Sequence, residues 1–206
     1  MIAIIDYGAG NLRSVQKACE AVGAAAVITA DKDTIAHADH VILPGVGAFG
    51  DCMHSLNHAN LTETVREAAL GGTPFLGICL GMQLLFERSE ESPGVKGLGI
   101  FPGEIVKIPK KEGYKIPHMG WNSLDFCGSS PLFEGLSDQP YVYFVHSYYA
   151  VPKNDGIIAA KTRYCGDLTV SIHENNIVAT QFHPEKSGEV GLQMLRNFAK
   201  LTEVGK

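Results

Sequence analysis

Short apolar runs alternate with stretches of helical spacing through the first half of the chain. The runs are Ile2–Ile5, Ala26–Thr29, Val41–Leu43 and Pro74–Ile78. Between them, a helix is expected from Asn11, its N-cap, to about Val22, and another over Thr62–Leu70, each ended by glycine. Short strands separated by helices indicate parallel βαβ units, whose loops meet at one edge of the sheet. The loops after the first, third and fourth runs are therefore expected to lie on the same edge.

The second half is richer in strands. Its strand-like segments are Ile100–Ile108, Tyr141–Val145, Ile157–Lys161, Leu168–His173 and Ile177–Phe182. Glu174-Asn175-Asn176 predicts a hairpin turn, so this half is expected to be antiparallel and to extend the parallel sheet. A last helix is expected at about Gly188–Leu201. We predict one α/β domain over residues 1–206, with a mostly parallel central sheet flanked by helices and extended by antiparallel strands.

Composition excludes several classes of function. The net charge is −5 and no run of Lys or Arg occurs, so binding to nucleic acid or anionic membranes is not favoured. No apolar segment approaches the roughly 20 residues needed to cross a bilayer, and Ile2–Ile5 lacks the basic start of a signal peptide. The five cysteines are widely spaced and form no C-x-x-C pair, as expected in the reducing cytoplasm. His54 and His58 lie four residues apart without a suitable acidic or cysteine partner, so neither a metal nor a cofactor is expected.

One cysteine lies between glycines, in Gly77-Ile78-Cys79-Leu80-Gly81. A nucleophile on a sharp strand-to-helix turn needs small neighbours, because the backbone is strained and side chains two residues away would collide. The turn places the sulfur at a helix N-terminus, which favours the reactive thiolate. A buried cysteine beside two turn glycines explains the pattern equally well when it is taken alone.

Two further segments supply what a cysteine nucleophile needs. In His183-Pro184-Glu185, which follows a predicted strand, residues two apart in an extended segment share a face, so the carboxylate could orient the imidazole as a base. The glycine-rich loop Pro44–Gly50 and the N–H of Leu80 could stabilise an oxyanion. A surface ion pair and a tight connection or phosphate loop are the alternatives, although the loop lacks the ending of a Walker motif. Asp6–Asn11 fails as a dinucleotide fingerprint, because Arg13 replaces its third glycine.

Three motifs in this order, L-P-G-V-G, G-I-C-L-G-M-Q and H-P-E, resemble those of the class I (triad) glutamine amidotransferases. Two further segments narrow the resemblance. I-D-Y-G-A-G-N-L-R-S-V at Ile5–Val15 and P-H-M-G-W-N at Pro117–Asn122 resemble the glutaminase subunits of imidazole glycerol phosphate synthases, which act in histidine biosynthesis. The resemblance runs from residue 4 to about residue 190 and shows no departure at a motif position.

The resemblance implies a cysteine–histidine–glutamate triad. Cys79 would attack the side-chain amide of L-glutamine to form a γ-glutamyl thioester, His183 would transfer the protons, and Glu185 would orient the imidazole. The oxyanion would be bound by backbone N–H groups, and further residues would hold the substrate. The oxyanion residues are Gly47, or Val46 if that peptide flips, with Leu80; the substrate-binding residues are Gln83, Ser147 and Tyr148.

The resemblance also implies a partner, because ammonia is useful only if it reaches an acceptor before it is protonated in water. That partner is a (β/α)8-barrel cyclase subunit in a heterodimer. The three glycines of the Pro44–Gly50 loop add a hypothesis of coupling: if the peptide near Val46-Gly47 rests flipped away, the partner's nucleotide would shift it into the donating orientation. The interface candidates are Asn11, Met119, Trp121, Asn122, Tyr143 and Lys186. For Trp121 the alternative is a core position, and for Lys186 a solvated surface lysine.

Three other functions are weighed against this one. The first is a class I glutaminase subunit of another synthase, such as the pyridoxal phosphate, anthranilate or carbamoyl phosphate systems; the N-terminal and tryptophan motifs argue against it. The second is a DJ-1/PfpI-like cysteine hydrolase, which would leave the H-P-E segment unexplained. The third is an inactive scaffold, which the presence of all three triad residues makes hard to sustain.

Overall fold

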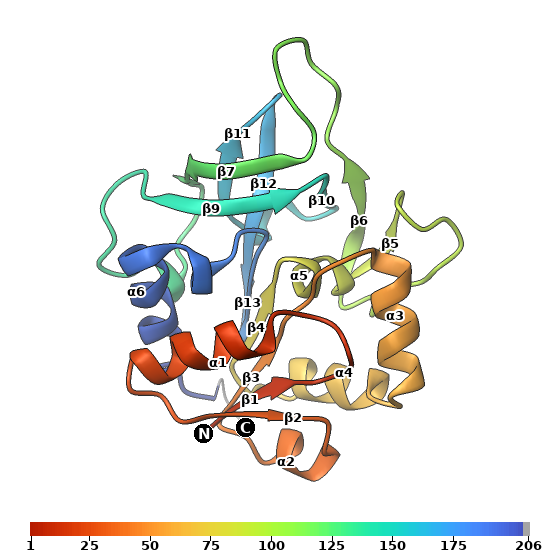
Figure 1. The fold of residues 1–206 in the computed structure, drawn as a ribbon, viewed down its shortest axis with the longest axis vertical. Coiled ribbons are helices and arrows are strands. Elements are labelled where there is room, and N and C mark those ends of the chain that lie inside the picture. Colours follow the sequence, from red (N-terminus) through yellow and green to blue (C-terminus); the bar gives the residue numbers. More distant parts are fainter. Residues whose placement is uncertain (204–206) are drawn as a thin grey trace.

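A computed structural model describes residues 1–203 of the chain (Figure 1). The elements of its first half are β1 (Ile2–Ile5), α1 (Leu12–Ala21), β2 (Ala26–Thr29), α2 (Lys32–Ala36), β3 (His40–Leu43), α3 (Phe49–His58), α4 (Thr62–Leu70), β4 (Phe75–Ile78), α5 (Leu80–Leu84) and β5 (Phe86–Ser89). Those of the second half are β6 (Phe101–Lys107), β7 (His118–Ser123), β8 (Asp125–Phe126), β9 (Tyr141–His146), β10 (Tyr148–Pro152), β11 (Ile158–Arg163), β12 (Asp167–Glu174), β13 (Ile177–Thr180) and α6 (Gly188–Phe198). Short 3-10 turns lie at Pro131–Phe133, Asp155–Ile157 and Pro184–Lys186.

The parallel part of the main sheet has the strand order β2-β1-β3-β4-β13. In the inner strands, buried apolar residues on opposite faces belong to two different hydrophobic cores. In β1, for example, Ile2 and Ile4 pack in the core that includes α1 and α6, whereas Ala3 and Ile5 pack in the core that includes α2, α3 and α4. Because side chains alternate across a strand, a strand covered on both faces must be apolar at every position. The continuous apolar runs in the sequence follow from this two-sided burial.

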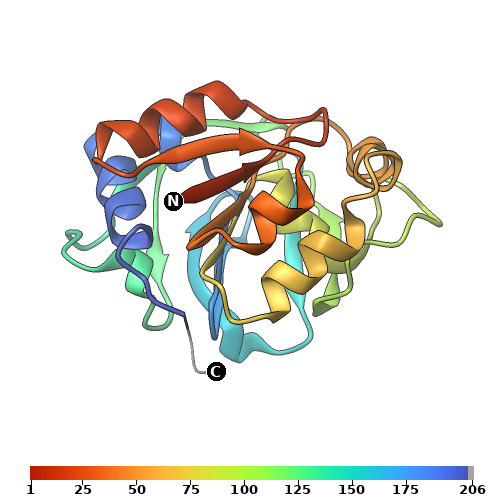
Figure 2. The same ribbon diagram turned by 90° about the horizontal axis from the view of Figure 1, so that it is seen from below.

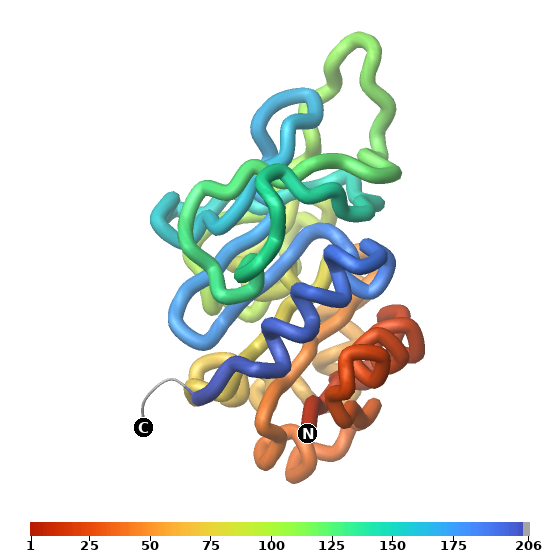
Figure 3. Tube along the Cα trace, turned by 90° about the vertical axis from the view of Figure 1, so that its left-hand side faces the viewer, coloured from red at the N-terminus to blue at the C-terminus, as the bar shows by residue number. Residues whose placement is uncertain are grey.

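Helices cover both faces of this sheet, as Figure 2 shows from below, with α1 and α6 on one side and α2, α3 and α4 on the other. In Figure 3 the helices α1 and α6 lie side by side on the face turned to the viewer. The predicted helix over Thr62–Leu70 is confirmed as α4. Asn11 occupies the N-cap position of α1, but its side chain makes no capping hydrogen bond. The final helix ends at Phe198, three residues earlier than predicted.

The antiparallel extension is confirmed in the order β13-β12-β10-β6, with β5 parallel to β6 at the edge. The hairpin turn between β12 and β13 has Asn175 at φ 54°, in the left-handed region that tight turns use. Tyr141–Val145 is an antiparallel strand as predicted, but it does not extend the main sheet. This segment is part of β9, which pairs with β7 in a separate two-stranded sheet. Its buried and less buried positions alternate, because only one of its faces packs on the core.

The predicted edge for a site is present. The loops after β1, β3 and β4 leave the carboxyl ends of neighbouring parallel strands, and the segment after β13 joins them there. The loop Pro44–Gly50 is shorter than predicted, because α3 begins at Phe49. Within residues 1–203, no helix combines the length and the apolar character that crossing a membrane requires.

Candidate active site

Cys79 lies on the turn between β4 and α5, as the glycine spacing predicted. Its backbone is strained, with φ 55° and ψ −108°, and its N–H is held by the Thr180 carbonyl at 2.7 Å. A Cβ on Gly81 would lie 1.8 Å from the carbonyl oxygen of Leu43, so only glycine lets α5 pack this closely against the end of β3. The strain is thus maintained by tight packing on both sides of the turn.

His183 and Glu185 form the expected pair, although not for the expected reason. The Nδ1 of His183 lies 2.8 Å from the Oε1 of Glu185, and both side chains are almost fully buried. The segment is not extended; Pro184–Lys186 is a 3-10 turn, which folds the carboxylate back onto the ring. The Oγ of Ser187 donates to the His183 carbonyl at 2.6 Å and fixes that turn. The pair is therefore positioned by a turn rather than by strand alternation.

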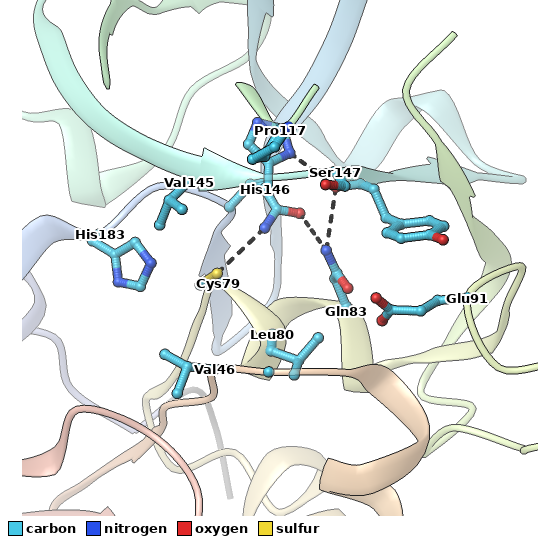
Figure 4. A pocket seen from close by; sticks show the side chains of 13 residues that line it. Val46, Cys79, Leu80, Gln83, Glu91, Pro117, Val145, His146, Ser147 and His183 are labelled. Atoms are coloured by element: carbon cyan, nitrogen blue, oxygen red, sulfur yellow. Dashed lines mark hydrogen bonds between the residues drawn. The ribbon is translucent and has the colours of Figure 1, made fainter. Parts of the chain in front are cut away.

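The free ring nitrogen of His183 is available for chemistry. Its Nε2 has no hydrogen-bond partner among the described residues, and Figure 4 shows the ring beside Cys79. Burial alone lowers the pKa of His183, but the thiolate of Cys79 and the carboxylate of Glu185 raise it by more, to about 10. The two neighbouring acidic groups therefore favour the protonated, imidazolium form of His183.

The expected oxyanion loop rests in a conformation that does not form the site. The N–H of Leu80 donates to the Gly45 carbonyl at 3.4 Å. Because the N–H and C=O of a trans peptide point in opposite directions, the N–H of Val46 points away from that of Leu80. The hydroxyl of Tyr7 donates to the Pro44 carbonyl at 2.7 Å, which anchors the start of the loop. The N–H groups of Leu80 and Val46 therefore do not converge here, while Gly47, the other predicted donor, lines the pocket beside them.

A pocket of about 320 Å³ opens at this edge of the sheet (Figure 4). The predicted residues that line it are Val46, Gly47, Cys79, Leu80, Gln83, Ser147, Tyr148 and His183. Ser147 is the single residue between β9 and β10, where the chain passes from the small sheet to the large one. Gln83 donates to the Tyr148 carbonyl at 3.3 Å, so the helix after Cys79 is joined to this corner.

Three polar residues that the sequence reasoning missed also line the pocket: Glu91, His146 and Gln181. Glu91 accepts a hydrogen bond from the N–H of Phe49 at 2.8 Å, at the start of α3. Gln181 is fully buried and lies 3.6 Å from the sulfur of Cys79 through its Nε2. A polar side chain in an apolar strand segment could have singled out Gln181. No local signal separates Glu91 from the neighbouring charges of Glu87–Glu90.

Four of the six expected interface residues lie together on the small sheet. Met119 and Trp121 on β7 are 62% and 56% exposed, which excludes the alternative of a core tryptophan. Trp121 contacts Tyr143 on β9 at a ring distance of 6.1 Å. The amide of Asn122 faces inward and donates to the Arg163 carbonyl at 3.2 Å.

The other two interface candidates lie in other elements. Lys186 is exposed in the turn after His183, and the hydroxyl oxygen of the adjacent Ser187 accepts a hydrogen bond from the N–H of Tyr143 at 3.0 Å. Asn11 is half-buried at the start of α1. Neither His54 nor His58 belongs to a metal-binding group, since no three His, Cys, Asp or Glu side chains within residues 1–203 are arranged to hold a metal ion.

Comparisons with known proteins agree with this geometry. The family model "Glutamine amidotransferase class-I" matches residues 3–201. The chain is 53% identical over 201 residues to "Imidazole glycerol phosphate synthase subunit HisH" of Methanothermobacter thermautotrophicus, with 98% of each chain covered. It is 51% identical over 206 residues to the Bacillus cereus protein of the same name, with 100% of this chain and 97% of that one covered.

Solved structures share the fold at much lower identity. One described as a glutamine amidotransferase has a TM-score of 0.75 at 19% identity and covers 98% of this chain and 100% of that one. Another, of PurLQS from Thermotoga maritima, has a TM-score of 0.72 at 18% identity, with 96% of each chain covered. The α/β fold predicted from the sequence is confirmed, and the named relatives favour neither another synthase nor a DJ-1/PfpI-like hydrolase. The chain therefore belongs to the class I glutamine amidotransferase family and, within it, to the HisH subunits of imidazole glycerol phosphate synthase.

Proposed function

We propose that this chain hydrolyses L-glutamine to L-glutamate and ammonia through a cysteine thioester, and that it passes the ammonia to a cyclase subunit. The observation that carries the proposal is the buried His183–Glu185 pair at 2.8 Å beside the strained Cys79, in a pocket lined by backbone and amide groups. A thiol, a base with one free nitrogen and a carboxylate that orients it are the parts that acyl transfer from an amide requires.

The residues act in a fixed order. The proton of Cys79 passes to Nε2 of His183, the thiolate so formed attacks the amide carbon, and the carbonyl oxygen becomes an oxyanion. His183 then gives the proton to the departing nitrogen, so ammonia leaves and a γ-glutamyl thioester remains. Water, activated by the same nitrogen, releases glutamate. Glu185 keeps Nδ1 protonated and stabilises the imidazolium at each stage.

The pocket supplies groups for the other end of the substrate. Glu91 is the carboxylate among the lining residues, and it matches the α-ammonium group of an amino acid in charge. Ser147 and Tyr148 line the pocket at the corner between the two sheets, and their backbone is proposed to contact the α-carboxylate and the α-amino group. Gln83 reaches the same corner through its amide. These contacts hold glutamine with its side chain toward Cys79.

The resting loop gives the proposal its regulation. The Gly45 carbonyl lies where an oxyanion would be stabilised, because it accepts the hydrogen bond of Leu80 at 3.4 Å. A flip of the Gly45–Val46 peptide would free the N–H of Leu80 and turn the N–H of Val46 toward the same point, forming two oxyanion donors. Low activity in the resting state follows, since loss of one such donor costs about 100- to 1000-fold in turnover.

The partner in this proposal is a (β/α)8-barrel cyclase, which covers the pocket so that ammonia does not escape into water. Met119 and Trp121 present exposed apolar surface on the small sheet, and Tyr143 packs against Trp121. The remaining proposed contacts are Asn11, Asn122 and Lys186. Residues 1–206 act as one glutamine amidotransferase domain in the cytoplasm without a bound cofactor, in keeping with free, widely spaced cysteines.

The decisive experiment measures glutamate release by the chain alone, with the cyclase, and with the cyclase and its nucleotide ligand. We expect slow turnover alone and stimulation only when both are present. Cys79→Ala should abolish hydrolysis in every mixture, whereas Cys127→Ala, at an exposed cysteine, should change nothing. Activity that survives Cys79→Ala would refute the triad. Equal turnover with and without the partner would refute the loop coupling and leave the triad standing.

A further inference from the structure

We propose that Gln181 is a positioning residue for the nucleophile: its side-chain amide donates a hydrogen bond to the sulfur of Cys79 and holds it as a thiolate turned toward His183. The inference rests on the proposed role of Cys79. Gln181 has no exposed surface and follows β13 directly, two residues before His183. Its Nε2 lies 3.6 Å from Sγ of Cys79.

A backbone carbonyl determines which end of each side-chain amide donates, and so it determines that Gln181 donates to Cys79. The carbonyl of Tyr148 can only accept, so the group of Gln83 that lies 3.3 Å from it must be the NH₂ end of its amide. The same NH₂ group donates its other hydrogen to Oε1 of Gln181 at 2.9 Å. The carbonyl of Gln181 is thereby turned toward Gln83, and its NH₂ group must face the sulfur. The dashed lines between Gln83 and Cys79 in Figure 4 mark the last two of these hydrogen bonds.

A second support fixes Tyr148 itself. Nδ1 of His146 lies 2.9 Å from the same carbonyl oxygen, which therefore accepts two hydrogen bonds. The carbonyl oxygen of Tyr148 accepts hydrogen bonds from both His146 and Gln83, so it needs the NH₂ end of the Gln83 amide. If that amide were reversed, its oxygen would face the carbonyl oxygen of Tyr148, and the two would repel each other. The donor that reaches the sulfur is thus the end of a network in which each member has one permitted orientation.

A base lies on the other side of the sulfur from Gln181. The sulfur receives a donor from Gln181, so its S–H cannot point that way. In Figure 4, His183 lies on the other side of Cys79 from Gln83, and the Nε2 of His183 has no partner among the described residues. A buried amide donor on one side and a free base on the other both favour transfer of the thiol proton to the imidazole. Hydrogen bonds to charged acceptors are stronger than neutral ones, so the thiolate gains more from Gln181 than the thiol does.

The test is the pH dependence of alkylation of Cys79 by iodoacetamide, followed at each cysteine by mass spectrometry. In Gln181→Met, which removes the donor at similar length, the midpoint should rise by about one to two pH units, which makes the thiolate fraction about 10- to 100-fold smaller at pH values below the wild-type midpoint. In Gln181→Glu, which presents an oxygen to the sulfur, it should rise at least as far. The exposed Cys127 supplies an internal reference that should not move.

A matched control separates positioning from packing. Ser171→Ala removes another fully buried side-chain hydrogen bond to β13, from Ser171 to the Ala179 carbonyl at 2.8 Å, without touching the site. It should leave the midpoint of Cys79 unchanged. If both Gln181 variants keep the wild-type midpoint while turnover falls, Gln181 only packs and the proposal is overturned.

A readout in the unsubstituted chain covers the case in which the variants do not fold. The side-chain amide resonances of Gln181 should shift with pH at the midpoint measured for Cys79, and this shift should vanish in Cys79→Ala. If the amide resonances of Gln181 do not shift at the midpoint of Cys79, the proposal is overturned. Failure of the proposed function is seen separately, as glutamine hydrolysis that persists in Cys79→Ala.

Discussion

Acid should unfold this protein partly through two buried histidines that face each other across the small sheet. His118 on β7 and His146 on β9 are paired in register, and Nδ1 of His118 lies 2.9 Å from Nε2 of His146. The ring of His118 is stacked between Phe144 and Tyr164. Burial lowers the pKa of His118 to about 4 and that of His146 to about 3. Both rings are therefore neutral in the folded chain at mildly acidic pH.

The sign and size of the effect follow from linkage. In the unfolded chain both histidines have a pKa near 6.5, so at pH 5 the unfolded state binds two protons that the folded state does not. Stability must fall as the pH falls from about 6.5 toward the folded pKa values. Lowering the pH from 7 to 5 costs about 2 kcal/mol for each histidine, a large part of the roughly 5–15 kcal/mol that stabilises a domain.

Urea unfolding at pH 7 and pH 5 measures this loss. His118→Gln keeps a polar group at the position and removes one titration, so its loss of unfolding free energy between the two pH values should be smaller than that of the wild type by about 2 kcal/mol. His54→Gln, at an exposed histidine on α3, should lose as much as the wild type. The reasoning fails if His118→Gln is as acid-sensitive as the wild type.

Three further perturbations test other parts of the structure. Gly81→Ala places a Cβ 1.8 Å from a backbone oxygen of β3 and should lower the unfolding free energy by at least about 3 kcal/mol, whereas Gly166→Ala, with open space around it, should be neutral in the same melt. Glu91→Gln should raise the KM for glutamine about 10- to 100-fold by losing a charged contact, with a much smaller change in kcat; an unchanged KM would contradict its role. Trp121→Ala should weaken cyclase binding at least about 10-fold in titration calorimetry without lowering Tm, since its ring is 56% exposed.

The elements that could be predicted from the sequence are those fixed by local chemistry. The turn at Cys79 requires small residues at fixed spacing, and the parallel strands need apolar residues at each position. Both features could therefore be predicted from the sequence pattern. The contact between His183 and Glu185 was predicted from strand alternation but arises from a 3-10 turn, because Pro184 starts a tighter path. The right residues were thus found through the wrong local geometry.

What could not be predicted depends on distant segments. Glu91 reaches the pocket because the segment after β5, at the edge formed by β5 and β6, contacts the start of α3. No residue near Glu91 in the sequence indicates this contact. The orientation of the Gly45–Val46 peptide depends on whether its carbonyl accepts the N–H of Leu80. A glycine-rich loop permits either orientation, so the sequence does not indicate which one is adopted. β9 was assigned to the wrong sheet, since a strand's alternation indicates one buried face but not which partner it pairs with.

The hydrogen bond between Leu80 and the Gly45 carbonyl has a consequence outside this subunit. A developing oxyanion and this carbonyl compete for one N–H group, so a ligand that occupies the oxyanion position must displace the resting loop. Coupling free energies are reciprocal: if the cyclase and its nucleotide favour the displaced loop, then a covalent glutamine analogue on Cys79 must tighten their binding by the same factor. The glutaminase then acts on its partner as much as the partner acts on it, and the nucleotide affinity of the synthase reports the orientation of one peptide bond in the other subunit.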